Sequence, residues 1–167
     1  GDADHPKQSF ASFAQELFAA VDAAPTAVTR VVIDLRGNGG GNSTILRPLL
    51  DGLKERPALK ARGHLYALVD AGTFSSGLLA AVVLRQDLKA ILVGEPPGEK
   101  PNSYGEVRPL TLPNSRLFIQ YSTKFFRMSG SADPPTYEPD VIVRRSIADA
   151  LAGRDPVLDT ALALPPR

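Results

Sequence analysis

The sequence predicts a single α/β domain built on a largely parallel β-sheet. Short apolar runs rich in β-branched residues alternate with segments whose apolar residues recur at helical spacing. Glycine-rich or serine-containing turns join each of the first two runs to the helix that follows. The length of 167 residues is that of one domain, and no internal repeat is present. We therefore treat residues 1–167 as one domain.

An amphipathic helix and a strand open the domain. Ser9 stands where it can cap the helix. Arg30 to Leu35 (RVVIDL) is a continuous apolar run that predicts a strand buried on both faces. The apolar face of the helix follows the spacing i, i+3, i+7, i+8 and i+11 in Phe10, Phe13, Leu17, Phe18 and Val21.

Two helices and a second strand follow. A helix is expected from Ser43, and Pro57 blocks its continuation. Leu65 to Val69 predicts a strand, and a helix of small residues is expected from Ser75 to about Arg85. The residues expected to face the core in the helix from Ser43 are Ile45, Leu46, Leu49, Leu50 and Leu53.

The second half of the chain is predicted to contain more strand than helix. Ala90 to Val93 is a third buried strand, and a polar loop is expected from Glu95 to Gly105. Leu110 to Leu112 and Leu117 to Tyr121 predict a β-hairpin around residues 113–115. The chain is expected to finish with a strand at Val141 to Val143 and short helices around Ala148 and Leu158.

Composition excludes several classes of function. Nineteen basic and eighteen acidic side chains leave a formal charge of +1 without like-charge runs, which argues against a nucleic-acid partner. No apolar run approaches the roughly 20 residues of a membrane-spanning helix. Cysteine is absent, and His5 and His64 lie far apart in the sequence, so we expect neither a metal site nor a cofactor.

A glycine-rich turn follows the first strand, at Gly37-Asn38-Gly39-Gly40-Gly41. Glycines leave backbone N–H groups unshielded, so such a turn can hold an oxyanion or a phosphate. The phosphate interpretation lacks the lysine that normally follows. A tight turn that packs strand against helix is the simplest alternative.

A serine turn, Gly72-Thr73-Phe74-Ser75-Ser76-Gly77, follows the second strand. A serine at a helix N-terminus is well placed for developing negative charge, although serines there usually serve as caps. After the third strand, Gly94-Glu95-Pro96-Pro97-Gly98-Glu99-Lys100 places a lysine in a polar loop. A shielded lysine can act as general base to a serine, whereas most loop lysines are simply solvated.

The order IDLRGNGGG, GTFSSG, VGEPPGEK resembles the C-terminal-processing (tail-specific) serine peptidase family. Ser75 and Lys100 lie 25 positions apart, which is the family's separation. The resemblance implies a crotonase/Clp-protease-like ββα superhelix and hydrolysis of protein or peptide substrates. It makes Ser75 the nucleophile, Lys100 the general base, and Gly40 or Gly41 together with Ser76 the oxyanion donors. It extends from Phe10 to Leu164.

Some positions depart from the family pattern. Pro101 follows the lysine, and Tyr104 stands where processing enzymes carry a glutamine that orients the lysine amine. The GTFSS turn is similar to that of a divergent bacterial branch of the family. Related branches, such as tricorn-like enzymes, take a histidine base from a segment upstream of the glycine-rich strand. The chain opens abruptly at Gly1. We therefore expect a missing N-terminal segment, with a histidine or a PDZ-like module, in an envelope or periplasmic protein.

Two functions remain open from the sequence. The first is a serine endopeptidase that acts through an acyl-enzyme on Ser75. The second is a non-catalytic binder of ligands or peptides on the same fold, which would need neither Ser75 nor an oxyanion hole. The presence of both GTFSS and GNGGG favours the enzyme. Asp34 and Arg36, which flank the glycine-rich turn, are expected to brace it rather than to take part in catalysis.

Overall fold

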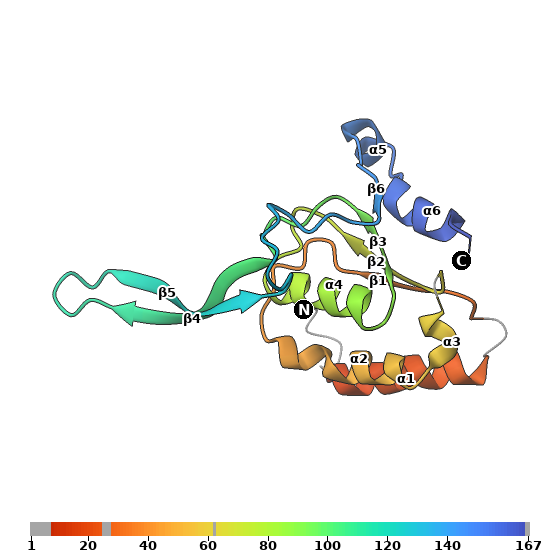
Figure 1. The fold of residues 1–167 in the computed structure, drawn as a ribbon, viewed down its shortest axis with the longest axis horizontal. Helices are drawn as coiled ribbons and strands as arrows, with labels where there is room; N and C mark the ends of the chain where they lie inside the picture. Colours follow the sequence, from red (N-terminus) through yellow and green to blue (C-terminus); the bar gives the residue numbers. More distant parts are fainter. Residues whose placement is uncertain (1–7, 25–27, 62, 166–167) are drawn as a thin grey trace.

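The computed structural model describes residues 8–24, 28–61 and 63–165. A parallel four-stranded sheet with the order β1-β2-β3-β6 forms its centre, and a separate antiparallel hairpin, β4–β5, projects from it (Figure 1). The predicted α/β architecture with a mostly parallel sheet is confirmed. The strands are β1 (Val31–Asp34), β2 (Leu65–Val69), β3 (Ile91–Gly94), β4 (Asn102–Thr111), β5 (Phe118–Arg127) and β6 (Val141–Ile142).

Helices cover both faces of the parallel sheet. On one face α4 contacts β2 and β3, while α1 and α2 form a further layer beyond it (Figure 1). On the other face α6 contacts the same two strands. The helices are α1 (Phe10–Ala23), the 3-10 turn η1 (Ser43–Leu46), α2 (Arg47–Lys54), α3 (Pro57–Lys60), α4 (Ser76–Gln86), α5 (Ile147–Leu151) and α6 (Pro156–Ala163). In the part of the chain that the structure describes, no helix combines the length and apolar character needed to cross a bilayer.

The core has two parts because side chains of a strand alternate between its faces. All five residues of β2 are buried. Leu65, Ala67 and Val69 belong to the cluster on the α4 side, whereas Tyr66 and Leu68 belong to the cluster on the α6 side. This double burial explains why a continuous apolar run predicted β2 with its correct limits.

Two expectations about burial are wrong. β1 lies at the edge of the sheet, so its valines and isoleucine are only half-buried and Asp34 is exposed, although burial on both faces was predicted. Ile45 is 52% exposed, while Leu49 and Leu53 are buried as expected. Residues 43–46 form a 3-10 turn, and its tighter winding breaks the helical spacing that placed Ile45 in the core.

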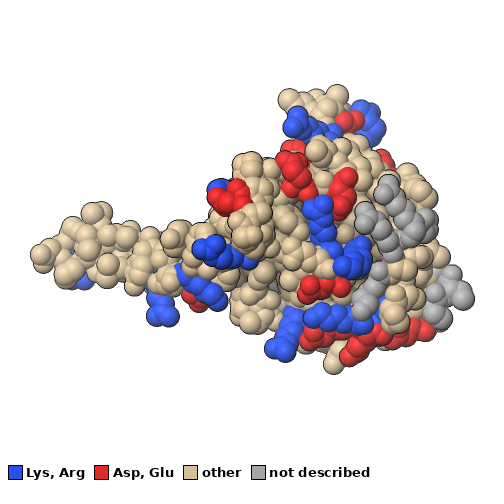
Figure 2. All heavy atoms as spheres, viewed as in Figure 1, with Lys and Arg blue, Asp and Glu red and all other residues tan. Residues whose placement is uncertain are grey.

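The hairpin is much longer than predicted. Its register pairs Asn102 with Arg127 at the base and Thr111 with Phe118 near the tip, so β4 begins inside the segment predicted to be a polar loop. Most of its residues are exposed, and Figure 2 shows mostly uncharged atoms with a few basic groups along it. Strands that bury neither face lack the apolar pattern by which strands are predicted.

Candidate active site

The glycine-rich turn and the serine turn are in direct contact. They follow β1 and β2, which are parallel neighbours, so both turns leave the same edge of the sheet. The N–H of Phe74 donates to the carbonyl oxygen of Asn38 at 2.9 Å. A methyl group added at Gly77 would lie 2.6 Å from the same oxygen, so the first turn of α4 packs tightly on the glycine-rich turn.

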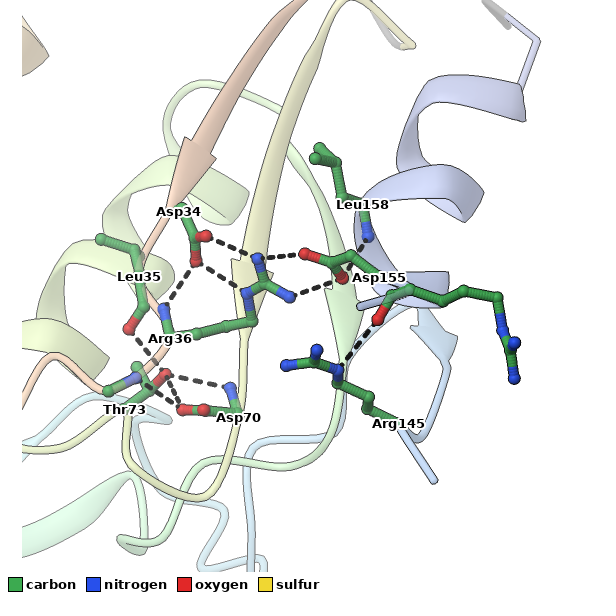
Figure 3. Close-up of polar contacts among 10 residues, drawn as sticks. Asp34, Leu35, Arg36, Asp70, Thr73, Arg145, Asp155 and Leu158 are labelled. Carbon is green, nitrogen blue, oxygen red and sulfur yellow. Dashed lines mark hydrogen bonds and ion pairs between the residues drawn. The ribbon is translucent and has the colours of Figure 1, made fainter. Parts of the chain in front are cut away.

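Asp70 joins the two turns, and it lies next to Thr73 of the serine turn (Figure 3). Its Oδ1 atom accepts hydrogen bonds from the N–H groups of Gly37 and Gly72, each at 2.9 Å. The buried hydroxyl of Thr73 donates to the carbonyl oxygen of Leu35 at 2.9 Å. The relative position of the two turns is therefore set by side chains at the ends of the strands. Asp70 was not singled out from the sequence, because its role depends on a partner 33 residues away.

Arg36 braces the outer side of the same edge, as the sequence predicted (Figure 3). Its guanidinium donates to both carboxylate oxygens of Asp34 and to both of Asp155, the latter at 2.8 Å each. Hydrogen bonds from Arg36 lower the pKa of Asp155 to about 2 and hold the pKa of Asp34 below its ordinary value. Asp155 also caps α6 by accepting from the N–H of Leu158. The hydrogen bonds of Arg36 with Asp34 and Asp155 therefore connect the start of the glycine-rich turn to α6.

Ser75 occupies the N-cap position of α4 in an unusual backbone conformation. Its φ and ψ angles are 52° and −118°, and positive φ is uncommon for a residue with a side chain. Its hydroxyl makes no capping hydrogen bond, unlike that of Ser9 on α1. Such strain is kept where the surrounding structure requires it, and it gathers at functional sites. Ser75 is therefore not a simple helix cap.

The predicted oxyanion donors lie beside Ser75. A methyl group added at Gly40 would lie 2.6 Å from the Cβ and 3.1 Å from the Oγ of Ser75. Gly40 and Gly41 have φ angles of +96° and +133°, which favour glycine at both positions. The N–H of Gly40 already donates to Asn38 Oδ1 at 3.0 Å. Gly41, Ser75 and Ser76 line one cavity, so the structure brings these predicted site residues together.

That cavity has a volume of about 510 Å³ and lies between the serine turn and the base of the hairpin. Its walls are largely apolar, and Glu99 and Glu106 are its acidic side chains. No lysine or arginine lines it among the described residues. The apolar wall residues are Phe74, Leu79, Tyr104, Val107, Phe126 and Met128.

Lys100 and its neighbour Glu99 contact different parts of the site. The Lys100 ammonium donates to Asp133 Oδ2 at 2.9 Å, and its side chain is 49% exposed. The hydrogen bond from Lys100 lowers the pKa of Asp133. Lys100 lines a second cavity of about 690 Å³, which does not include Ser75. Glu99 reaches Ser75 instead, where its Oε2 accepts the backbone N–H at 2.6 Å.

The histidines supply no base within the described residues. His64 lies directly before β2, and its Nδ1 is 2.7 Å from the carbonyl oxygen of Thr29. His5 lies outside the described residues. No group of three or more potential metal ligands occurs within residues 8–24, 28–61 and 63–165.

Comparison with known proteins identifies the fold. No protein-family model matches the chain, and no curated protein matches it either. The fold is similar to the crystal structure of the "Putative S41 protease" from Bacteroides fragilis NCTC 9343, with a TM-score of 0.59 and 16% sequence identity. The match covers 96% of this chain and 51% of that protein, so the chain spans about half of its length. The chain thus shares its mixed α/β fold with the Bacteroides fragilis protein.

Proposed function

We propose that this chain is a serine peptidase domain in which Ser75 forms an acyl-enzyme with peptide substrates. The observation that carries the proposal is the geometry of Ser75: a strained residue at the start of α4, with no capping bond from its hydroxyl, in contact with the turn at Gly40. The fold similarity to the "Putative S41 protease" and the motif order support it. We also propose that the chain belongs to the tail-specific branch of these peptidases and that its fold is the crotonase-like superhelix.

The backbone hydrogen bonds indicate which amides are available to an oxyanion. Gly40 donates to Asn38 and Ser75 donates to Glu99, so both of these N–H groups are occupied. We therefore assign the oxyanion donors to Gly41 and Ser76. Negative charge that develops on the substrate carbonyl would also lie near the positive end of α4. The Ser75 Oγ attacks the carbonyl carbon, the amine leaves with a proton, and water hydrolyses the ester.

Reaction with a fluorophosphonate probe tests the nucleophile. This reagent phosphonylates activated serines, and we expect it to label the folded chain at Ser75 but not the heat-denatured chain. Mass spectrometry of proteolytic fragments would locate the modified residue. A folded chain that stays unlabelled, or that is labelled at another serine, contradicts the proposal.

Lys100 is the general base that the motif implies, and in this role it would have to leave its ion pair with Asp133. An ammonium held by Asp133 is a donor, so the ion pair must open and the ammonium must release a proton to solvent before the neutral amine can accept the proton of Ser75. About half of each side chain is exposed to solvent, and exposed ion pairs contribute little to stability. Opening this ion pair therefore costs little free energy.

Lys100→Arg separates the two roles of this side chain. Arginine keeps the ion pair with Asp133 but stays protonated, so it cannot accept the serine proton. We expect Lys100→Arg and Lys100→Ala to lose kcat equally, by about 10² to 10⁴-fold. The measurement is peptide hydrolysis by each variant. Activity retained in Lys100→Arg would assign the base to another residue, such as a histidine upstream of this chain.

A non-catalytic peptide binder on the same fold is the second candidate. The apolar cavity beside the hairpin favours it, because pockets of this size and lining hold ligands without chemistry. Peptide binding by a folded chain that the fluorophosphonate does not label would support this function over the first.

A further inference from the structure

Glu99 links the loop after β3 to the serine turn. Its Oε2 accepts the N–H of Ser75 at 2.6 Å, and its Oε1 accepts the hydroxyl of Ser103 at 2.7 Å. The side chain is half-buried and lines both cavities of the site. The backbone of this loop also lies close to the residue before the serine turn. A methyl group added at Gly98 would lie 2.3 Å from the carbonyl oxygen of Ala71.

The backbone of Ser75 needs such a restraint. A residue with a side chain is strained in a sparsely populated region of φ and ψ, and the surroundings must offset this strain. The carbonyl oxygen of Ser75 is held by the N–H of Leu79 at 3.0 Å, in the first turn of α4. Its N–H is held only by Glu99 in the described part of the chain. A carboxylate is also favoured electrostatically at the N-terminus of a helix.

We propose that Glu99 is a positioning residue for the nucleophile. Its carboxylate joins Ser75 to Ser103, holds Ser75 in its positive-φ conformation and keeps the Ser75 N–H out of the oxyanion site. The role in catalysis rests on the proposed peptidase function. The restraint on the backbone does not, so the two can be tested separately.

Amide hydrogen exchange at Ser75, followed by NMR, tests the restraint without any activity. In the unmodified protein and in Glu99→Gln we expect a protected amide, because the glutamine oxygen still accepts the N–H and Ser103 can accept from the glutamine amide. In Glu99→Ala exchange should become about tenfold faster or more. Glu106→Ala is the matched control, since it removes a carboxylate from the same cavity that makes no hydrogen bond to Ser75. Unchanged protection in Glu99→Ala would overturn the proposal.

The rate of fluorophosphonate labelling tests the consequence for the nucleophile. We expect Glu99→Ala to react about 10 to 100-fold more slowly, and Glu99→Gln to react within about threefold of the unmodified protein. Ser103→Ala, which removes one anchor of the carboxylate, should fall between them and serves if Glu99→Ala does not fold.

The outcomes of the labelling experiment are distinct. Glu99→Gln as slow as Glu99→Ala, with its Ser75 amide still protected, would make the charge rather than the position essential and overturn the proposal. Faster labelling of Glu99→Ala would reveal an inhibitory contact and also overturn it. If the unmodified protein is not labelled at all, the peptidase function fails, while the exchange experiment still decides whether Glu99 holds Ser75.

Discussion

We expect Ser75→Ala to abolish peptide hydrolysis and to leave the thermal unfolding temperature nearly unchanged. Removal of the nucleophile of a serine peptidase lowers kcat by about 10⁴ to 10⁶-fold. Stability is expected to persist because the Ser75 hydroxyl makes no capping bond, and alanine meets the same backbone strain as serine. Hydrolysis of a fluorescent casein and thermal unfolding followed by circular dichroism measure the two effects.

Ser76→Ala is the control for this experiment. Ser76 begins α4, and its assigned contribution is the backbone N–H, which alanine retains. We expect a far smaller loss of kcat than in Ser75→Ala. Equal losses in the two variants, or no loss in either, would show that the wrong serine or the wrong class of reaction has been assigned.

Gly40→Ala is expected to have the second largest effect on activity. The new methyl group would lie 2.6 Å from the Cβ of Ser75 and 3.0 Å from the carbonyl oxygen of Phe74, so one of the two turns must move. The φ angle of +96° adds backbone strain. Because the adjacent Gly41 would shift with it, we expect hydrolysis to fall by about 10² to 10³-fold, as when an oxyanion donor is lost.

Gly39→Ala makes the same chemical change one residue earlier in the turn. Apart from the adjacent residues of the chain, no described atom lies within 4 Å of a methyl group there, and Gly39 does not have a positive φ. We expect nearly full activity and stability. The same assays compare the two variants, and an active Gly40→Ala would show that the contact between the turns does not matter for hydrolysis.

The positions of the central elements could be read from the sequence because each has a strong local cause. β2 is buried on both faces and therefore appears as an unbroken apolar run. The cap of α1 at Ser9 follows from local residue preferences. The two turns lie side by side because the parallel strands that precede them end at a common edge of the sheet.

Tertiary structure alone decided which side chains face Ser75. Glu99 and Lys100 are neighbours in one loop, 24 and 25 residues after Ser75, and a sequence motif cannot tell which of them turns toward that serine. Asp70 likewise gains its role from a turn after another strand. The length of the hairpin escaped prediction because its strands bury little apolar surface, so their pairing leaves no periodic pattern. Local propensity and burial produce patterns in consecutive residues, which a sequence shows directly. Contacts between loops depend instead on how the sheet brings distant segments together.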